Sequence, residues 1–170
     1  MLGISGQCIG VTSKPPVRLT VDRGALIALE RVFEAASPAE GCALLLGSTG
    51  CSWHLQRIWP TLNNWPEPAE RTRRFSLDPR EQLLAQRWAR DHGLRVLGSA
   101  HSHPCTAPMP SRLDLELTVP PALMLIAGRE QEPDPSQAKG GWSWGCWWLQ
   151  EQRDGAPLLA PLQLPWTMAD

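Results

Sequence analysis

The sequence predicts one α+β domain in which a mixed β-sheet is flanked by helices. The chain has 170 residues, which suits a single domain with its own core. Short apolar runs have the length expected of buried strands, whereas two longer segments carry apolar side chains at helical spacing. Because these segments do not follow a regular strand–helix–strand alternation, we expect an α+β sandwich. We place the domain at residues 17–165, after a flexible lead-in at residues 1–16.

The first part of this domain is predicted to contain a strand, a helix and a hairpin. Residues 17–22 alternate apolar and polar side chains, as a half-buried strand does. Residues 23–36 have the apolar spacing of a helix, and Asp22 stands where it can cap that helix. The continuous apolar run at residues 42–47 predicts a buried strand, with its hairpin partner at residues 51–59.

The middle of the chain is predicted to contain a loop, a short strand and a second helix. Residues 60–70 are rich in Asn and Pro and predict a loop, and residues 71–77 predict a short strand. Asp78 and Pro79 begin a helix that ends at Gly93. One face of that helix is expected to contain Leu83, Leu84, Arg87 and Trp88.

The last part of the domain is predicted to contain further strands and one short helix. Ser111 is placed to cap that helix. The polar segment at residues 129–141 is expected to be the most flexible interior part of the chain. The strands are predicted at residues 94–100, 122–128, 142–150 and 158–164, and the helix at residues 112–118.

Charge and cysteine content argue against several classes of protein. The formal charge is −1, from 16 basic and 17 acidic residues, so we expect neither nucleic acid nor an anionic membrane as a partner. The apolar runs are too short to span a bilayer, and the N-terminus lacks the pattern of a signal peptide. The five cysteines form no C-x-x-C pair and are odd in number. We therefore expect reduced thiols in a cytoplasmic protein.

Two histidines, His101 and His103, follow the strand predicted at residues 94–100. Alternate side chains of an extended segment face the same way, so both imidazoles are expected to project together. Asp114 lies on the first turn of the predicted short helix and can fold back towards them. Two imidazoles and one carboxylate are a ligand set typical of catalytic zinc, which keeps a fourth position for water. The pattern therefore predicts a metal site with a hydrolytic role.

Hydrolysis at such a site also needs a group that takes a proton from water and passes it to the leaving amine. A carboxylate suits that role. Near the histidines the other acidic residue is Glu116, which follows Asp114 closely and is expected to face away. The order of residues alone does not identify this base.

The region around the histidines resembles the motif of the JAMM (MPN-plus) zinc metalloprotease family. Residues 38–47 are similar to the glutamate-bearing strand of that family, and residues 63–64 and 74–79 are similar to segments of its small prokaryotic members. The resemblance covers roughly residues 17–150. Its most specific part is the series His101-Ser-His103-Pro104 and Pro110-Ser111-x-x-Asp114.

This resemblance implies a cytidine-deaminase-like (MPN) α+β sandwich and a zinc-dependent peptidase or isopeptidase. It implies that His101, His103 and Asp114 bind Zn²⁺. Glu40 is then the residue that deprotonates the attacking water and protonates the leaving amine, and Ser111 donates a hydrogen bond to the developing oxyanion. The resemblance also suggests a protein or peptide substrate, such as the Gly-Gly tail of a ubiquitin-like sulfur-carrier protein.

Two positions depart from the family pattern without touching a proposed ligand. The family often has Cys-Gly after the glutamate, where this chain has Gly41 and Cys42. Ala100 precedes the first histidine, where a larger residue is common. These differences concern the packing at the strand edge rather than the metal site.

Other interpretations of the sequence stay open. One alternative is a non-catalytic MPN-type scaffold, and another is a relative of RadC-like proteins, although these usually carry a helix-hairpin-helix module that the short lead-in has no room for. Cys105 could act as a further zinc ligand or be an ordinary loop residue, and Ser111 could be only a helix cap. The Trp-rich segment at residues 142–148 is expected to pack in the core, with an exposed binding surface as the alternative. The oligomeric state is not predicted.

Overall fold

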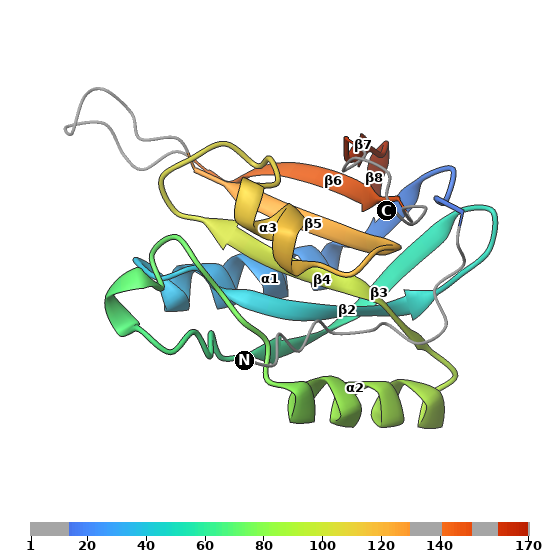
Figure 1. The fold of residues 1–170 in the computed structure, drawn as a ribbon. Coiled ribbons are helices and arrows are strands. Elements are labelled where there is room, and N and C mark those ends of the chain that lie inside the picture. Colours follow the sequence, from blue (N-terminus) through green and yellow to red (C-terminus); the bar gives the residue numbers. More distant parts are fainter. Residues whose placement is uncertain (1–13, 130–140, 151–159, 170) are drawn as a thin grey trace, which may run out of the picture.

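An eight-stranded mixed sheet forms the centre of the computed structural model, which describes residues 14–129, 141–150 and 160–169 (Figure 1). The strand order is β7-β6-β5-β4-β2-β3-β1-β8. The β1–β3, β1–β8 and β4–β5 pairs are parallel, and the other pairs are antiparallel. The strands are β1 (Leu19–Asp22), β2 (Cys42–Ser48), β3 (Trp53–Thr61), β4 (Arg95–His103), β5 (Ala122–Gly128), β6 (Ser143–Leu149), β7 (Leu162–Gln163) and β8 (Trp166–Ala169).

Helices cover both faces of this sheet, as the α+β prediction requires. The helices are α1 (Arg23–Ala36), α2 (Pro79–Asp91) and α3 (Arg112–Leu117), with a 3-10 turn, η1, at Pro68–Glu70. Helix α1 packs on one face, and α2 and α3 lie on the other (Figure 1). None of the helices among the described residues is long and apolar enough to cross a membrane.

The main core lies between α1 and the sheet. Ala25, Leu29 and Phe33 form the buried face of α1. They belong to the same apolar cluster as Leu97 of β4 and Trp148 of β6. Burial of each large side chain in such a core contributes about 1.5–3 kcal/mol. This cluster therefore holds β4, which carries both histidines, firmly against the first helix.

The Trp-rich strand β6 contributes to this core, as expected. Cys146 and Trp148 are fully buried, and Trp142 and Trp144 pack against the same cluster. The ring centroids of Trp142 and Trp144 each lie 5.9 Å from the ring centroid of Phe33. The expectation of core packing is thus confirmed for this face of the strand.

Several sequence predictions of the first half are confirmed, including the N-cap position of Asp22. Helix α1 spans residues 23–36 as predicted, and Asp22 is its N-cap residue. The Asp22 side chain makes no capping hydrogen bond; instead its Oδ1 lies 2.6 Å from Nε2 of His54. Strand β3 extends to Thr61 and includes Pro60, which was expected in a loop. Proline is tolerated there because β1 pairs only with residues 53–55 of β3, which leaves the other side of Pro60 without a strand partner in the described sheet.

The strand predicted at residues 71–77 is wrong. Residues 71–73 form a turn and residues 74–78 have no regular structure. The main chain of this segment is held by a side chain instead of by a neighbouring strand, because the Asn63 amide donates to the Arg74 carbonyl at 2.8 Å. The backbone N–H of Asn64 also donates to the Ser76 carbonyl at 2.9 Å. Local side-chain hydrogen bonds of this kind compete with strand pairing.

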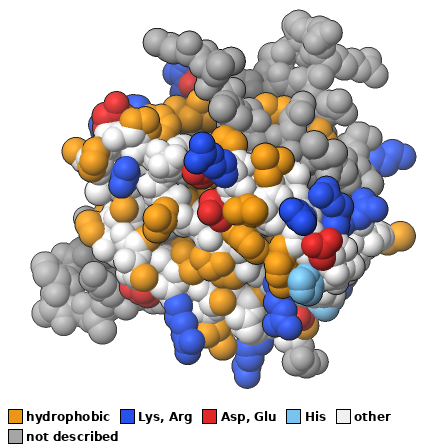
Figure 2. Space-filling model, turned by 90° about the horizontal axis from the view of Figure 1, so that it is seen from below, with side chains coloured by type: hydrophobic (Ala, Val, Ile, Leu, Met, Phe, Trp, Pro, Cys, Tyr) orange, Lys and Arg blue, Asp and Glu red, His pale blue; other side chains and the backbone are white. Residues whose placement is uncertain are grey.

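The residues that α2 buries most deeply differ from the group predicted to share one face. Leu83 and Leu84 are 64% and 52% exposed, whereas Ala85 and Ala89 are fully buried. The two alanines allow the helix to approach the sheet closely, and they pack in one cluster with Leu44 and other side chains of the sheet. Figure 2 looks onto this side of the molecule and shows apolar side chains exposed among basic ones.

The C-terminal predictions are confirmed only in part. Of the strand predicted at residues 158–164, the structure contains β7 at Leu162–Gln163, while residues 158–159 lie outside the described part. Strand β8 was not predicted; it pairs with β1 at the far edge of the sheet. Most of the segment 129–141 and of the lead-in 1–16 also lies outside the described residues.

Candidate metal centre

Three ligand-type side chains meet at one end of the sheet: His101, His103 and Asp114. The Nε2 atoms of the two histidines are 3.0 Å apart. The Oδ2 atom of Asp114 lies 3.5 Å from His101 Nε2 and 3.6 Å from His103 Nε2. All three residues are buried, with exposed fractions of 0%, 6% and 8%. Three potential ligand atoms therefore face one small, desolvated space.

Strand pairing and a helix cap produce this convergence. His101 and His103 are alternate residues at the end of β4, so they share one face of the strand. Asp114 stands at the third position of α3, where a capping box fixes it: its carboxylate accepts from the Ser111 N–H at 2.7 Å, and its own N–H donates to Ser111 Oγ at 3.2 Å. The same carboxylate thus caps the helix and faces the histidines.

The two imidazoles are oriented by different neighbours. His103 Nδ1 lies 3.0 Å from the Ala107 carbonyl, so Nδ1 carries the proton and Nε2 presents its lone pair to the cluster. The ring of His101 stacks on Phe75, with 4.4 Å between ring centroids. The Nδ1 atom of His101 is buried, and none of the described residues gives it a hydrogen-bond partner. These contacts hold both rings with Nε2 towards Asp114.

The loop after β4 is held close to the sheet, which keeps the Ala107 carbonyl against His103. Trp147 Nε1 donates to the Pro108 carbonyl at 2.8 Å. At Gly128 an added Cβ atom would lie 2.4 Å from Pro108 N, so the loop approaches β5 more closely than any larger residue would allow. Gly128 therefore has a packing role beside the candidate site.

The charges of the cluster fit a bound divalent metal. Burial lowers the pKa of His101, which favours the neutral imidazole that a metal requires. Burial opposes ionisation of Asp114, but its contacts with the imidazoles of His101 and His103 hold its pKa well below the usual range. For His103, burial favours the neutral form, yet Asp114, Ala107 and Glu40 together raise its pKa. Two imidazole nitrogens and a carboxylate oxygen are a donor set compatible with zinc.

Glu40 is the other buried acid beside this cluster. Its Oε1 atom lies 4.0 Å from His103 Nε2, and the residue is only 5% exposed. Burial raises its pKa to about 8, with a further contribution from Asp114, while His103 acts in the opposite direction. The pKa of Glu40 is thus raised and that of Asp114 lowered, as expected of two carboxylates that have different roles in one site.

Strand β2 brings Glu40 to the histidines. Cys42 pairs with His101 across the antiparallel β2–β4 ladder, so the start of β2 meets the end of β4. Ser102, which points away from the metal cluster, accepts a hydrogen bond from the Gly41 N–H at 2.9 Å. The Ser102 N–H in turn donates to the Gly41 carbonyl at 3.0 Å. Gly41, the residue after Glu40, is thus joined to β4 by two hydrogen bonds, which hold Glu40 close to the histidines.

Glu40→Gln is expected to change how the stability of the metal-free protein depends on pH. The pKa of Glu40 rises from an ordinary value of 4.5 to about 8 in the folded state. Between these values the unfolded chain has lost the proton and the folded chain keeps it. Stability therefore falls as pH rises, by at most about 1.4 kcal/mol per pH unit. Denaturant unfolding with chelator at pH 5 to 9 should show wild type losing stability relative to the variant up to about pH 8. Parallel curves would contradict this.

The remaining predicted residues lie around the cluster without joining it. Ser111 is exposed at the start of α3, and its hydroxyl oxygen accepts from the helix N–H, so its own proton is free to be donated outwards. Cys105 is exposed and does not belong to the group of ligand atoms within 4.8 Å of one another. Glu116 binds Arg112 at 2.6 Å, in keeping with the expectation that it faces away.

Four contributors to the site were not identified by the sequence analysis. Asn63, Phe75, Ser102 and Ala107 fix the positions of Glu40 and the histidines through the contacts given above and below. Asn63 and Phe75 were noted only as parts of family-like segments, and Ser102 only as the residue between the two histidines. Their roles, like that of Ala107, depend on tertiary contacts that no local pattern contains.

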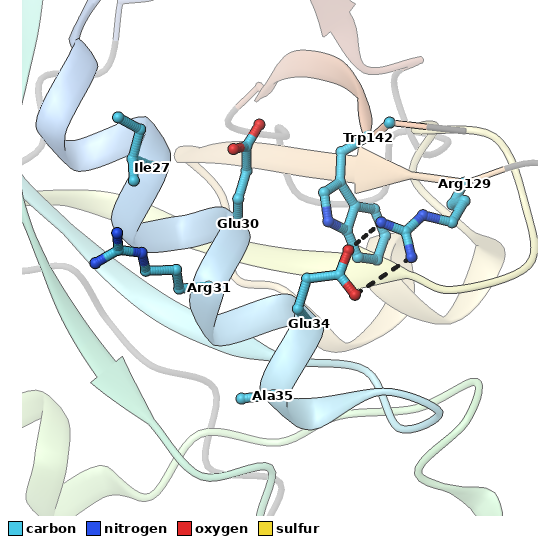
Figure 3. A pocket seen from close by; sticks show the side chains of 8 residues that line it. Ile27, Glu30, Arg31, Glu34, Ala35, Arg129 and Trp142 are labelled. Atoms are coloured by element: carbon cyan, nitrogen blue, oxygen red, sulfur yellow. Dashed lines mark hydrogen bonds and ion pairs between the residues drawn. The ribbon is translucent and has the colours of Figure 1, made fainter. Parts of the chain in front are cut away.

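A concavity lies against α1 (Figure 3). The carboxylate of Glu34 pairs there with the guanidinium group of Arg129. The Cζ atom of that guanidinium group lies 4.1 Å from the centroid of the Trp142 ring. None of the residues that line this concavity belongs to the metal cluster. Its ion pair links α1 to the end of β5 and has a structural role.

The fold is a mixed sheet with helices on both faces, and the site places the His-x-His and Ser-x-x-Asp elements beside a buried glutamate. Together they define a domain of the JAMM/MPN class. Residues 25–146 match the family of prokaryotic homologs of the JAB domain. This match spans well over half of the chain, and the chain belongs to that family. The family resemblance and the α+β fold predicted from the sequence are both confirmed.

Individual relatives agree with this assignment. The chain is 33% identical over 99 residues to a desampylase of Pyrococcus furiosus, a match that covers 58% of this chain and 66% of the relative. A solution structure of a protein from Desulfitobacterium hafniense is similar with a TM-score of 0.69 and 27% identity, covering 89% of this chain and 93% of that one. A protein from Salinibacter ruber matches with a TM-score of 0.51 and 26% identity, over 82% and 95% of the two chains.

Proposed function

We propose that this protein is a zinc-dependent peptidase or isopeptidase of the JAMM type. The observation that carries the proposal is the convergence of His101, His103 and Asp114, all buried, with the protonatable carboxylate of Glu40 at 4.0 Å from His103. A structural metal site needs no such neighbour, whereas a hydrolase requires a group that can accept and return a proton. A cytoplasmic location stays a prediction from the sequence.

The substrate we propose is a protein or peptide, cleaved at the C-terminal tail of a ubiquitin-like protein. The match to a desampylase supports an isopeptidase that acts on a ubiquitin-like modifier. A sulfur-carrier protein with such a tail is the more specific candidate that the sequence suggested. An extended tail of this kind is suited to bind beside a strand at the edge of a site.

In this proposal His101, His103 and Asp114 hold the zinc ion, which when bound would polarise the scissile carbonyl and lower the pKa of a water molecule. Glu40 takes the proton from the attacking water and delivers it to the leaving amine. Its buried position supports this role, because burial brings the pKa of a carboxyl group into the range where it can both accept and return a proton. Ser111 donates a hydrogen bond to the oxyanion, while its oxygen atom keeps the helix cap.

The second candidate is a non-catalytic scaffold with the same fold. The presence of a complete ligand set and of a buried carboxylate beside it favours the enzyme, since a scaffold requires neither. The two candidates differ in one measurable property, because only the enzyme cleaves a tail when it carries zinc.

The proposed function is tested with a ubiquitin-like carrier protein fused through its C-terminal tail to a reporter. We expect about one zinc per chain and cleavage of the fusion at the end of the tail. A strong chelator should stop the cleavage, and added zinc should restore it. A folded protein that carries zinc and cleaves neither this fusion nor an isopeptide-linked version would favour the scaffold. A folded protein that never binds zinc would exclude the zinc-dependent reaction.

A further inference from the structure

The side-chain amide of Asn63 is the hydrogen-bond centre of the region behind the candidate active site. Its Nδ2 atom lies 3.1 Å from the carbonyl oxygen of Glu40 and 2.8 Å from that of Arg74. It also lies 3.5 Å from the carbonyl of Arg71. On the other side of the amide, Oδ1 accepts from the N–H groups of Trp65 and Ser76, at 3.1 Å and 3.4 Å. One side chain thus satisfies main-chain groups from three separate stretches of the chain.

These stretches carry the groups that face the histidines. The first contains Glu40, whose own N–H donates to the Arg71 carbonyl at 2.7 Å. The second is the irregular segment 71–78, which carries Phe75 onto the ring of His101. Since none of the described strands pairs with this segment, the Asn63 amide supplies part of the main-chain hydrogen bonding that a sheet would give. Both the glutamate and the aromatic ring therefore depend on the same anchor.

We propose that Asn63 is a positioning residue of the active site. Its amide fixes the main chain at Glu40 and at residues 71–76. The Glu40 carboxylate and the Phe75 ring are thereby kept in place beside the two histidines. This inference rests on the proposed function of the site. Asn63 acts through Glu40 and Phe75 and contacts no reacting atom in this proposal. A displacement of about 1 Å is enough to reduce the rate of a positioned proton transfer severely.

Both halves of the amide are used, which makes the identity of the residue testable. The NH₂ group donates to carbonyls, and the oxygen accepts from N–H groups. Asn63→Asp keeps the size and the acceptor oxygen but loses the donor bonds to Glu40 and Arg74. Asn63→Ala loses both. Asn64→Ala is a matched control, because Asn64 is exposed and its structural contact is made by the main chain.

The experiment compares wild type, Asn63→Asp, Asn63→Ala and Asn64→Ala, all loaded with zinc and shown to be folded by thermal unfolding. For both Asn63 variants we expect kcat for cleavage of the carrier fusion to fall by about 10- to 100-fold, the size typical of residues that orient the groups of a metal site. KM should change little. Asn64→Ala should resemble wild type. The NMR signals of the His101 ring protons, shifted by the stacked Phe75 ring, should move in both Asn63 variants and not in the control.

The outcomes separate this proposal from the proposed function. If wild type cleaves the fusion and Asn63→Asp is as active as wild type, the donor bonds do not position the site and the inference is overturned. Unchanged His101 ring signals in Asn63→Ala would overturn it as well, and this measurement needs no activity. If wild type binds zinc but cleaves nothing, the proposed function fails, while the NMR comparison still decides whether Asn63 places Phe75 on His101. If Asn63→Asp does not fold, Asn63→Ala gives the same decision.

Discussion

Glu40→Gln is expected to abolish hydrolysis while leaving zinc bound. The glutamine side chain has the same shape and occupies the same buried position, but its amide cannot accept the proton of the attacking water. Loss of a general base typically costs about 10² to 10⁴ in rate. Metal binding should persist, because the ligand atoms that converge belong to His101, His103 and Asp114, and Glu40 does not belong to that group.

The measurement combines zinc content with single-turnover cleavage of the carrier fusion. Glu116→Gln is the matched control: Glu116 is also an acid near the histidines in the sequence, but it is paired with Arg112 at the surface. Its substitution should leave both zinc and rate unchanged. Near-normal turnover by Glu40→Gln would remove Glu40 from the role of base, and loss of zinc from that variant would show that it helps to hold the metal.

The difference between these two acids shows what the sequence could and could not predict. The ligand pattern of His101, His103 and Asp114 is local, because strand alternation and a helix cap are enough to bring its members together, and the structure does so. Glu40 is far away in the sequence. Its position depends on the antiparallel register that pairs Cys42 with His101, which no local pattern contains. Without the family resemblance, the sequence would not have connected Glu40 with the histidines.

The errors in the fold have a common physical origin in tertiary contacts. The predicted helix face contained the apolar residues Leu83 and Leu84, yet close packing against the sheet selects Ala85 and Ala89 as the buried residues of α2. Residues 71–77 were predicted to form a strand, but the Asn63 amide binds main-chain groups of Arg74 and Ser76 instead. In both cases a local preference was overridden by a partner elsewhere in the chain. The candidate site is affected directly, since the second error concerns the segment that carries Phe75.

His103→Ala is expected to lose zinc. The substitution removes one of three converging ligand atoms. Nε2 of His103 lies 3.0 Å from His101 Nε2, closer than Oδ2 of Asp114 at 3.5 Å. If a site of this kind binds zinc with about 10 kcal/mol and the ligands contribute comparably, one ligand accounts for roughly a third. Affinity should then fall by about a hundredfold or more. Competition with a chromophoric chelator measures this change directly.

The same variant should also lose most of its activity, since Asp114 and His101 alone hold the ion too weakly and Glu40 then has no activated water to deprotonate. His92→Ala is the control, because His92 is an exposed histidine at the end of α2, stacked on Trp88 and remote from the ligand group. It should bind zinc as wild type does. A comparison of thermal stability with and without added zinc shows whether His103→Ala has lost metal binding or its fold. Added zinc should raise the Tm of wild type and of His92→Ala and leave the Tm of folded His103→Ala unchanged. Full zinc occupancy in folded His103→Ala would mean that the ligands lie elsewhere, and the reaction proposed for this site would then have no metal.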